Sequence, residues 1–520
     1  MFHRIGSIFI VLSIVVLSLD GVSAVSGNLQ LMDVFCLEYA SDPQVSPNGD
    51  QIVYVRNSMD VMKDKRRSEL WVVRSDGSEN RPLTTGKQND SAPRWAPDGR
   101  RLLYVSSDDG NTQLYLRWMD TGQTAKLTQL SRSPAGLSWS PDGRWIAFSM
   151  LVPEQPKTIA KLPPKPKGAD WAGSPSVIER VRFRADGKGF LENGYTQLFV
   201  LSADGGTPRQ LTTGRYRHQA QVDWTPDSRK LIFSANRTED WEYGPLNTEV
   251  YELELSSGDL KVLTKRNGPD RNPKVSPDGE TIAYLGFDDR LQGYQVTQLY
   301  LMDSDGRNSR LLSAELDRSI SDAQWRSDGQ GLFIQFDDRG NTRIASIDLE
   351  GKVQNLVSDL CGLSIGRPYS TGVFSTSEDG RLAYTLSRSD FPADVAVWSA
   401  SQAEEKRLTH LNADLFSFRR IREVEEIWFK SSYDGRDIQG WVVKPPDFEA
   451  QNKYPLILEI HGGPFANYGP TFSAELQLYA ASGYVVLYAN PRGSTSYGEE
   501  FGNLIHHNYP GQDYDCLLYT

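Results

Sequence analysis

The sequence predicts an all-β part, a seven-bladed β-propeller over residues 29–416, followed by an α/β part over residues 421–520. Two observations support this division. A turn tetrapeptide recurs seven times at a spacing of about fifty residues. The recurrence stops after Phe416, where a strand, a helix and a second strand follow one another. Repeated short strands favour a propeller, whereas strand–helix–strand order favours a parallel sheet covered by helices.

The recurring tetrapeptide is Ser-Pro-Asp-Gly, in which each residue type suits its place in a type I turn. Proline presets φ at the second position, and glycine commonly occupies the fourth. Clear copies begin at Ser46, Ala96, Ser140, Thr225 and Ser276, and degenerate copies begin at Ser327 and Glu378. Each copy precedes an apolar, strand-like run, so each is predicted to be a turn between two strands.

A second signature, Leu-Thr or a degenerate form of it, closes each repeat. Its seven copies fall at Leu83, Leu127, Leu211, Leu263, Leu312, Val357 and Leu408. Short strands at fixed spacing, about four per unit of forty to fifty residues, are typical of propeller blades, which bury their faces against their neighbours. Because both signatures occur seven times, the sequence predicts seven blades.

An insertion lengthens the third repeat by about 35 residues, from about Leu151 to Gln197. Its proline- and lysine-rich stretch 161–167 favours an extended loop over another strand pair. The charged residues that follow form either a lip over the propeller mouth or a solvated loop face: Glu179, Arg180, Arg182 and Arg184.

Composition and charge exclude several classes of function. The chain has 520 residues, with 67 Asp and Glu against 56 Lys and Arg, which gives a formal net charge of −11. The acidic balance, without a run of five or six like charges, argues against a nucleic-acid binder, which normally has a basic face, so neither DNA nor RNA is an expected partner. The three cysteines, Cys36, Cys361 and Cys516, allow at most one disulfide, so stability must come from a buried core.

The amino terminus is typical of a secretory signal peptide over residues 1–24. His3 and Arg4 precede an apolar run that ends near small residues, and cleavage is expected after Ala24. The run is shorter than the ~20 apolar residues that span a bilayer, and no later segment is apolar enough. We therefore expect an exported protein, secreted or periplasmic, with no membrane span after cleavage. Its sequons at Asn89 and Asn236 would lie on surface loops.

The α/β part contains two nearly all-apolar strand patterns, at 455–460 and 484–489, with a helical stretch from about Phe472 to Ala481 between them. The first strand leads into His461-Gly462-Gly463-Pro464. A glycine-rich turn at the carboxyl end of a strand lets a backbone N–H point into a crevice without an obstructing side chain, as an oxyanion hole requires. The alternative is a tight turn that needs glycine only for its φ angles.

These residues, with Asn490-Pro-Arg-Gly-Ser494 and Tyr497-Gly-Glu-Glu-Phe501, resemble the opening of the peptidase domain of prolyl oligopeptidase family serine peptidases. The branch that they resemble contains acylaminoacyl peptidases and secreted dipeptidyl peptidases, and the repeated turns resemble its TolB-like propeller. The resemblance implies the N-terminal part of an α/β-hydrolase domain and a propeller that admits short peptides. It also implies that Gly463 N–H is an oxyanion donor, and that His461, beside Gly462, shapes the hole without being the triad histidine.

The same resemblance implies a Ser-Asp-His triad that follows Phe501. The residues after the propeller are too few for a complete hydrolase sheet, so we expect the triad beyond Thr520 and interpret the sequence as a truncated, inactive form.

Gly362-Leu363-Ser364-Ile365-Gly366 matches the G-x-S-x-G elbow of hydrolases. It lies inside the repeat and precedes the oxyanion turn, so Ser364 is not expected to be catalytic.

The remaining histidines do not suggest a metal site. His506 and His507 are adjacent and point different ways, which favours solvated or capping roles. His218 and His410 are expected in propeller loops, without a carboxylate or cysteine at ligand spacing. The sequence contains no zinc, calcium-loop or phosphate-loop motif, so no cofactor is expected.

Two functions stay open. The first is an exported serine peptidase that cleaves short peptides and is dipeptidyl or acylaminoacyl peptidase-like; the second is a TolB-like binding propeller with a non-catalytic hydrolase remnant. Exopeptidase or endopeptidase action and the oligomeric state are also open. A dipeptidase-like enzyme needs a carboxylate for the substrate ammonium. The candidates, each of which is otherwise a solvated loop acid, are Glu179, Glu239, Asp240 and Glu242.

Overall fold

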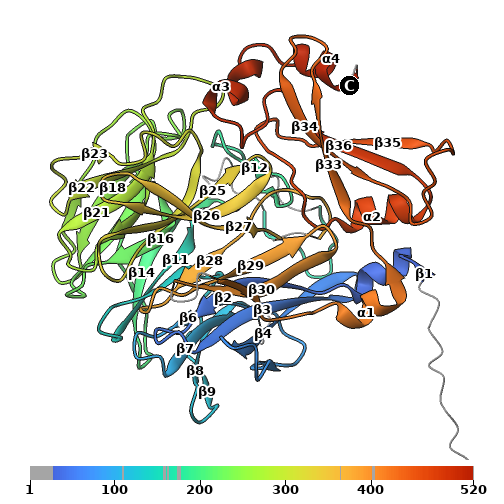
Figure 1. Ribbon diagram of the computed structural model, residues 1–520. Helices are drawn as coiled ribbons and strands as arrows, with labels where there is room; N and C mark the ends of the chain where they lie inside the picture. The colour runs from blue at the N-terminus through green and yellow to red at the C-terminus, as the bar shows by residue number, and fades with distance from the viewer. Residues whose placement is uncertain are drawn as a thin grey trace, which may run out of the picture.

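The computed structural model describes residues 27–107, 111–155, 160, 163–172, 177–362, 365–400 and 404–518. Its larger part is a ring of antiparallel sheets, and its smaller part is a mixed sheet with short helices, at the upper right in Figure 1. The expected signal peptide, residues 1–24, and Ser364 lie outside the described residues. None of the helices within these ranges has both the length and the apolar character needed to cross a bilayer.

Seven four-stranded units make up the ring, as the sequence predicts. Blades 1 and 2 are β2 (Tyr39–Val45), β3 (Gln51–Asp60), β4 (Lys65–Arg74), β5 (Arg81–Pro82) and β6 (Asp90–Trp95), β7 (Arg101–Ser106), β8 (Gln113–Trp118), β9 (Thr124–Lys126). Blades 3 and 4 are β10 (Ala135–Trp139), β11 (Trp145–Pro153), β14 (Gly194–Ser202), β15 (Arg209–Gln210) and β16 (Arg217–Trp224), β17 (Lys230–Asn236), β18 (Glu249–Glu254), β19 (Leu260–Val262).

The last three blades complete the ring, and blades 6 and 7 share one sheet through the pairing of Leu360 with Leu386. Blade 5 is β20 (Asp270–Val275), β21 (Thr281–Gly286), β22 (Gln298–Asp303), β23 (Arg310–Leu311). Blades 6 and 7 are β24 (Ile320–Trp325), β25 (Gly331–Asp338), β26 (Asn341–Asp348), β27 (Val353–Leu360) and β28 (Phe374–Thr376), β29 (Leu382–Arg388), β30 (Phe391–Ser399), β31 (Glu404–Arg407).

The two sequence signatures have direct structural reasons. In each of the seven turns, the N–H of the fourth residue donates to the carbonyl of the first at 2.8–3.0 Å, the bond that defines a closed β-turn. In the closing signature, shown by blade 3, Leu211 N–H donates to the Leu198 carbonyl at 2.8 Å, and Leu198 N–H returns a 2.9 Å bond to the Thr212 hydroxyl. The Leu-Thr pair thereby fixes the outer strand of the blade.

The ring closes by packing between the last blade and the first. Ala40 and Val45 of β2 share a buried cluster with Val395 and Val397 of β30. Val45 N–H also donates to the Ser375 hydroxyl at 2.9 Å. The first strands of neighbouring blades contact one another, so these strands face the propeller axis.

The smaller part, hereafter the C-terminal unit, is a four-stranded sheet with the order β33 (Val424–Lys430), β34 (Asp437–Val443), β36 (Val485–Asn490) and β35 (Leu456–Ile460). Strands β35 and β36 are parallel and are joined through α2 (Ala474–Ala481), which confirms the predicted strand–helix–strand order. The shorter elements are α1 (Ala413–Phe418), α3 (Glu499–Gly502), η2 (Asn503–Ile505) and α4 (Gln512–Leu518).

Strand β35 is not covered along its whole length. Its apolar composition is typical of strands buried on both faces, but Leu456 and Ile460 of β35 are 60% and 45% exposed. Strand β35 pairs with β36 on one side only within the described sheet. Composition does not state where in the sheet a strand lies, and burial depends on that position.

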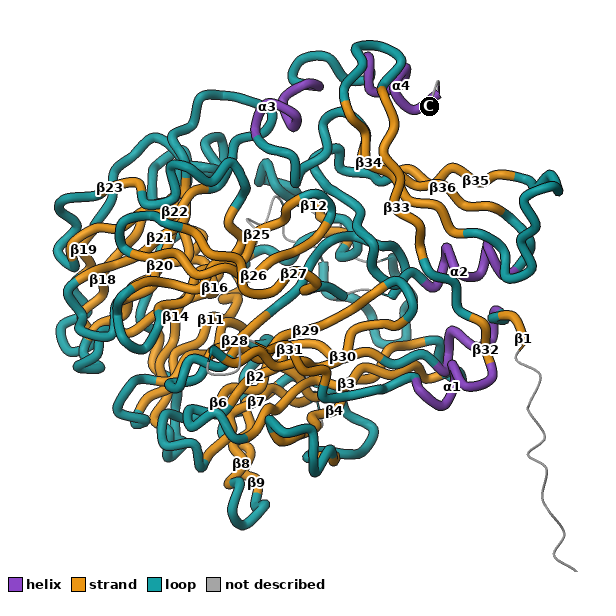
Figure 2. Tube along the Cα trace, viewed as in Figure 1, coloured by secondary structure: helices purple, strands orange, loops and turns teal. Residues whose placement is uncertain are grey.

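The C-terminal unit contacts one particular side of the propeller. The loops that join the second and third strands of a blade, here called 2–3 loops, all open on the same side of the ring. Those of blades 5, 6 and 7 contact the unit: Asn503 accepts from Tyr294 N–H at 3.1 Å, Ser496 from Gly340 N–H at 2.8 Å, and Ser389 from Val424 N–H at 3.4 Å. In Figure 2 the smaller sheet lies beside the ring on this side.

The first described residues also contact the C-terminal unit. Strand β1 (Gly27–Asn28) pairs in parallel with β32 (Arg419–Arg420), and η1 (Leu31–Cys36) follows it. Asp33 and Arg419 form an ion pair at 2.6 Å. The first strand of blade 1 therefore begins only at Tyr39, although the sequence predicts the propeller from residue 29.

Candidate functional site

The glycine-rich turn His461-Gly462-Gly463-Pro464 follows β35 at the carboxyl end of the parallel strand pair. Gly462 and Gly463 are exposed. Gly463 has φ +144°, a region that favours glycine, and a Cβ built there would lie 3.0 Å from the Phe465 nitrogen. The Gly462 N–H donates to the Tyr369 hydroxyl at 3.3 Å, whereas the Gly463 N–H has no acceptor among the described residues. An exposed, unpaired N–H at this position can bind an oxyanion.

The His461 ring holds the turn in place through contacts of both its nitrogens. Its Nε2 lies 2.8 Å from the Ser494 hydroxyl and its Nδ1 lies 3.1 Å from the Gly462 carbonyl. Burial lowers the pKa of His461, although the bond to the Gly462 carbonyl acts in the opposite direction. A neutral imidazole satisfies both contacts when Nδ1–H donates to Gly462 and the Ser494 hydroxyl donates to Nε2.

The His461–Ser494 contact is not a catalytic dyad. Ser494 is completely buried, so its hydroxyl cannot reach a substrate. It also lies 2.7 Å from the Pro491 carbonyl, a second acceptor for its single proton. No carboxylate orients Nδ1, which faces the Gly462 carbonyl instead, so the arrangement lacks the acid of a triad.

A cluster of aromatic rings holds the turn against the propeller. The Tyr468 ring lies edge-on to His461 at 5.2 Å and contacts Tyr369, from the segment between β27 and β28, at 4.8 Å. The Asn490 side chain bonds both the N–H and the carbonyl of Tyr468, at 2.8 and 2.9 Å. Sequence analysis missed Tyr369 and Tyr468, because no short motif marks contacts between residues a hundred positions apart.

The other histidines have structural surroundings. His506 accepts from the Gly293 N–H at 2.8 Å, which is a capping role, and the exposed His507 ring lies 4.0 Å from it. His410 is exposed in a loop. The prediction that His218 lies in a loop is wrong: it is in β16 and is 2% exposed, because an inner strand of a blade faces its neighbours. Among the described residues, no group of three or more His, Cys, Asp or Glu could hold a metal ion.

The structure brings the insertion and the acidic 2–3 loop of blade 4 together. Glu242 pairs with Arg180 at 3.1 Å, so its charge is already compensated, whereas Glu179, Glu239 and Asp240 are exposed. Arg184 begins the short hairpin of β12 (Arg184–Ala185) and β13 (Gly189–Phe190).

The sequon residue Asn236 is 3% exposed at the end of β17, so the expected surface position is wrong for it.

The G-x-S-x-G match has no elbow around it. Ser364 itself lies outside the described residues, and the strands on either side are β27 and β28 of adjoining blades. The segment 365–373, which is described, contains no helix. A nucleophile elbow requires a helix directly after the serine.

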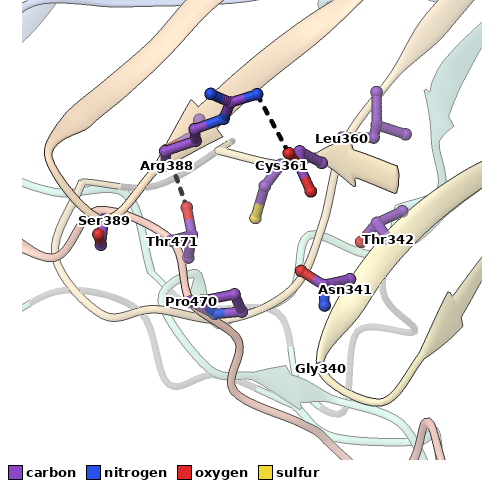
Figure 3. A pocket seen from close by; sticks show the side chains of 11 residues that line it. Gly340, Asn341, Thr342, Leu360, Cys361, Arg388, Ser389, Pro470 and Thr471 are labelled. Atoms are coloured by element: carbon purple, nitrogen blue, oxygen red, sulfur yellow. Dashed lines mark hydrogen bonds and ion pairs between the residues drawn. The ribbon is translucent and has the colours of Figure 1, made fainter. Parts of the chain in front are cut away.

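A cavity of about 220 Å³ lies between blades 6 and 7 and the segment that follows the turn. Figure 3 shows Arg388, Cys361, Asn341 and Thr471 around it. Its polar groups are paired, Arg388 with Asp359 at 3.3 Å and Thr471 with Ser387 at 2.8 Å. Burial raises the pKa of the Cys361 thiol, which makes it a poor nucleophile.

Comparison with known proteins identifies both parts of the chain. Residues 38–161 match the model of the TolB beta propeller domain, residues 182–284 that of the dipeptidyl peptidase IV N-terminal region, and residues 470–518 that of the prolyl oligopeptidase family.

Curated relatives align over nearly the whole chain. An uncharacterized peptidase of Bacillus subtilis, YuxL, is 31% identical over 501 residues, which cover 94% of this chain and 74% of that protein. Dipeptidyl-peptidase 5 of Porphyromonas gingivalis is 26% identical over 496 residues, covering 92% and 70%.

Solved structures share the fold at lower identity. Acylaminoacyl peptidase of Pyrococcus horikoshii superposes with a TM-score of 0.74 at 20% identity, covering 92% of this chain and 69% of that one. A puromycin-hydrolyzing peptidase of Mycobacterium tuberculosis superposes with a TM-score of 0.67 at 16% identity, covering 95% and 73%. The chain has a propeller and an adjoining α/β sheet, and a peptidase aligns with nearly all of its residues. The chain therefore belongs to the prolyl oligopeptidase family of peptidases.

Proposed function

We propose that the protein is a serine peptidase of short peptides, dipeptidyl or acylaminoacyl peptidase-like, and that Gly463 N–H stabilises the oxyanion of its tetrahedral intermediate. The observation that carries the proposal is the exposed, unpaired N–H of Gly463 at the end of β35. The relatives dipeptidyl-peptidase 5 and acylaminoacyl peptidase support peptides as the substrate class.

Within this proposal each residue of the turn has a separate role. Gly463 presents the donor, because it is exposed and its N–H has no acceptor among the described residues. The Gly462 N–H is occupied by Tyr369, which ties the turn to the propeller. His461, held by Ser494, fixes the Gly462 carbonyl and with it the plane of the peptide that carries the Gly463 N–H. A rigidly placed donor costs no reorganisation when charge develops on the substrate.

The nucleophile, the base and the acid are proposed to lie outside residues 1–520, because the family resemblance places them after Phe501. The described residues support this placement, since the Ser494–His461 contact is buried and lacks an acid. Residues 1–520 alone are accordingly proposed to be inactive. We also propose export, on the signal-like pattern of residues 1–24.

Two observations test the proposal. The reading frame downstream of codon 520 should stay open and encode a G-x-S-x-G elbow; a stop codon there would favour the binding-propeller alternative. The polypeptide from the complete frame should hydrolyse dipeptidyl or acetyl-aminoacyl anilides, and Gly463→Pro, which removes the N–H, should lower kcat by about 100-fold or more. An unchanged kcat would remove Gly463 from the oxyanion hole.

A further inference from the structure

The 2–3 loops of blades 3 and 4 enclose a cavity of about 770 Å³ on the side of the ring that the C-terminal unit contacts. Part of its lining is aromatic: Phe183 and Phe190 of the β12–β13 hairpin stack with ring centroids 6.1 Å apart, and Phe190 is 69% exposed. Arg180, Arg182 and Arg217 also line this cavity, together with the other charged residues Lys188, Glu179, Asp186 and Glu192. An apolar lining with a few charged groups is typical of a ligand site.

Only one of these three arginines is neutralised by a described carboxylate. Arg180 pairs with Glu242 at 3.1 Å and lies 4.5 Å above the Tyr195 ring. Arg182 and Arg217 form no ion pair with any described residue. The pKa of Arg217 lies below the usual arginine value, because the cavity wall removes water from its guanidinium and because Arg182 and then Arg180 add like charge. Crowded, partly desolvated cations are unfavourable unless an anion joins them.

A fourth arginine repeats the pattern in the adjoining part of the same mouth. Arg237 lies 4.5 Å above the Tyr216 ring, and its Nη1 lies 2.7 Å from His218 Nε2. His218 Nδ1 lies 2.9 Å from the Thr196 carbonyl, so Nδ1 carries the proton and Nε2 accepts from Arg237. Burial lowers the pKa of His218 to about 4, so the partner of Arg237 is a neutral ring and its charge stays uncompensated.

We infer that Arg182 and Arg217 bind the carboxylate of a peptide substrate in this cavity. The ligand class rests on the proposed peptidase function. A carboxylate matches the two parallel donors of a guanidinium, and a second guanidinium can bind its remaining lone pairs. The stacked rings of Phe183 and Phe190 offer apolar surface for the side chain next to that carboxylate.

The cavity lies on the same side of the ring as the glycine-rich turn. Phe465, directly after the turn, stacks on Tyr294 of the blade 5 loop at 5.8 Å. Blade 4 is the neighbour of blade 5, and blade 3 the next, so their 2–3 loops continue the same rim. Glu179 and Asp186 line the same cavity and are exposed, and neither forms an ion pair with Arg182 or Arg217.

The test is the binding of acetylated peptides to the full chain by isothermal titration calorimetry, which needs no catalysis. Acetyl-Ala-Ala-Phe with a free carboxylate should bind at least tenfold tighter than its amide. Arg217→Gln and Arg182→Gln should each remove most of this preference. Arg215→Gln is the matched control, because Arg215 lies two residues away and already pairs with Glu154; it should keep the preference. The preference should also shrink as salt rises from about 50 to 500 mM.

Two further measurements separate a lost ligand contact from a misfolded chain and identify the carboxylate that binds. Arg217→Gln should melt at the same temperature as the unchanged chain or slightly higher, because it removes a crowded charge. A large fall in melting temperature would show misfolding. The peptide-binding preference of Arg182→Gln would then decide whether the site binds a carboxylate. Acetyl-Ala-Glu-Phe amide reveals the source of the carboxylate: tight binding means that a side-chain carboxylate suffices, and weak binding means that the carboxyl terminus is required. Either result supports the site.

Equal binding of acid and amide, a preference that survives Arg217→Gln and Arg182→Gln, or no binding of any peptide would each overturn the inference. Failure of the proposed function is seen separately, by the absence of serine labelling in the polypeptide from the complete frame. A labelled enzyme without carboxylate preference would keep the peptidase and reject this site.

Discussion

At the residue scale, the hydrogen bond beneath the glycine-rich turn should contribute measurably to stability. In Ser494→Ala, buried His461 Nε2 loses its partner, which should cost roughly 1–3 kcal/mol of unfolding free energy. Denaturant unfolding measures the loss. Ser482→Ala, which removes an exposed hydroxyl bonded within the end of α2, should change stability by about 0.5 kcal/mol or less. Equal effects of the two changes would mean that the Ser494 bond does not hold the turn.

His218 should make the propeller less stable in mild acid. Its folded pKa is lowered to about 4 from the ordinary 6.5, so the unfolded chain binds the proton first as pH falls. Its contribution is therefore complete above about pH 6.5 and is lost progressively toward pH 4, and the loss amounts to about 2 kcal/mol at pH 5. Melting curves at pH 7 and pH 5 should differ less for His218→Gln than for the unchanged chain. An identical pH shift in both would contradict the buried, neutral assignment.

The sequence identifies the residues of the glycine-rich turn but not the groups that hold them. His461, Gly462 and Gly463 form a recognisable tetrapeptide with Pro464, and both glycines are exposed. Tyr369 reaches the turn from the propeller, and only folding brings it there. Ser494 belongs to a recognisable motif, yet its bond to His461 depends on the pairing of β35 with β36.

At the scale of elements, the propeller is predictable because each blade repeats local chemistry. The turn bond from the fourth residue to the first and the Leu-Thr pair both form within one blade, so a single sequence displays them seven times. Strand β35 shows the limit of this reasoning. Its residues Leu456 and Ile460 have the composition of a covered strand, but exposure depends on neighbours that its own sequence does not specify.

The glycine at the end of the blade 6 turn should be needed for its backbone conformation alone. Gly329 has φ +67°, and a Cβ there would meet nothing within 4 Å. Gly329→Ala should therefore cost about 1 kcal/mol through the left-handed backbone, with no steric term. Gly329→Asn should cost less, because asparagine tolerates this region better. Chemical denaturation compares the two, and an alanine variant as stable as the unchanged chain would refute the backbone explanation.

At the scale of the whole molecule, the contact between propeller and C-terminal unit is beyond prediction from the sequence. Both sides are irregular loops, and their fit depends on close backbone approach rather than on a motif. A Cβ on Gly469 would lie 1.9 Å from the Gly340 carbonyl, and one on Gly340 would lie 2.8 Å from the Trp441 ring. The repeat and the strand–helix–strand pattern predict the two parts, but not this joint.

Gly469→Ala should loosen this joint without unfolding either part. Because its Cβ would overlap the Gly340 carbonyl, we expect a loss of roughly 1–3 kcal/mol and faster proteolysis between β31 and β33. Gly244→Ala is the control, since a Cβ there meets nothing within 4 Å. Limited proteolysis followed by mass spectrometry locates the cuts. If Gly469→Ala resists protease as well as Gly244→Ala does, the close approach does not join the two parts.

The central proposal is that this chain carries the propeller and the oxyanion turn of a serine peptidase whose nucleophile lies outside residues 1–520. Fluorophosphonate labelling with mass-spectrometric mapping tests it most directly, because the probe reacts only with an activated serine. We predict no stoichiometric label on residues 25–520, and a label on one serine after residue 520 in the polypeptide from the complete frame. A label on Ser364 or Ser494, or no label in the complete polypeptide, would contradict the claim.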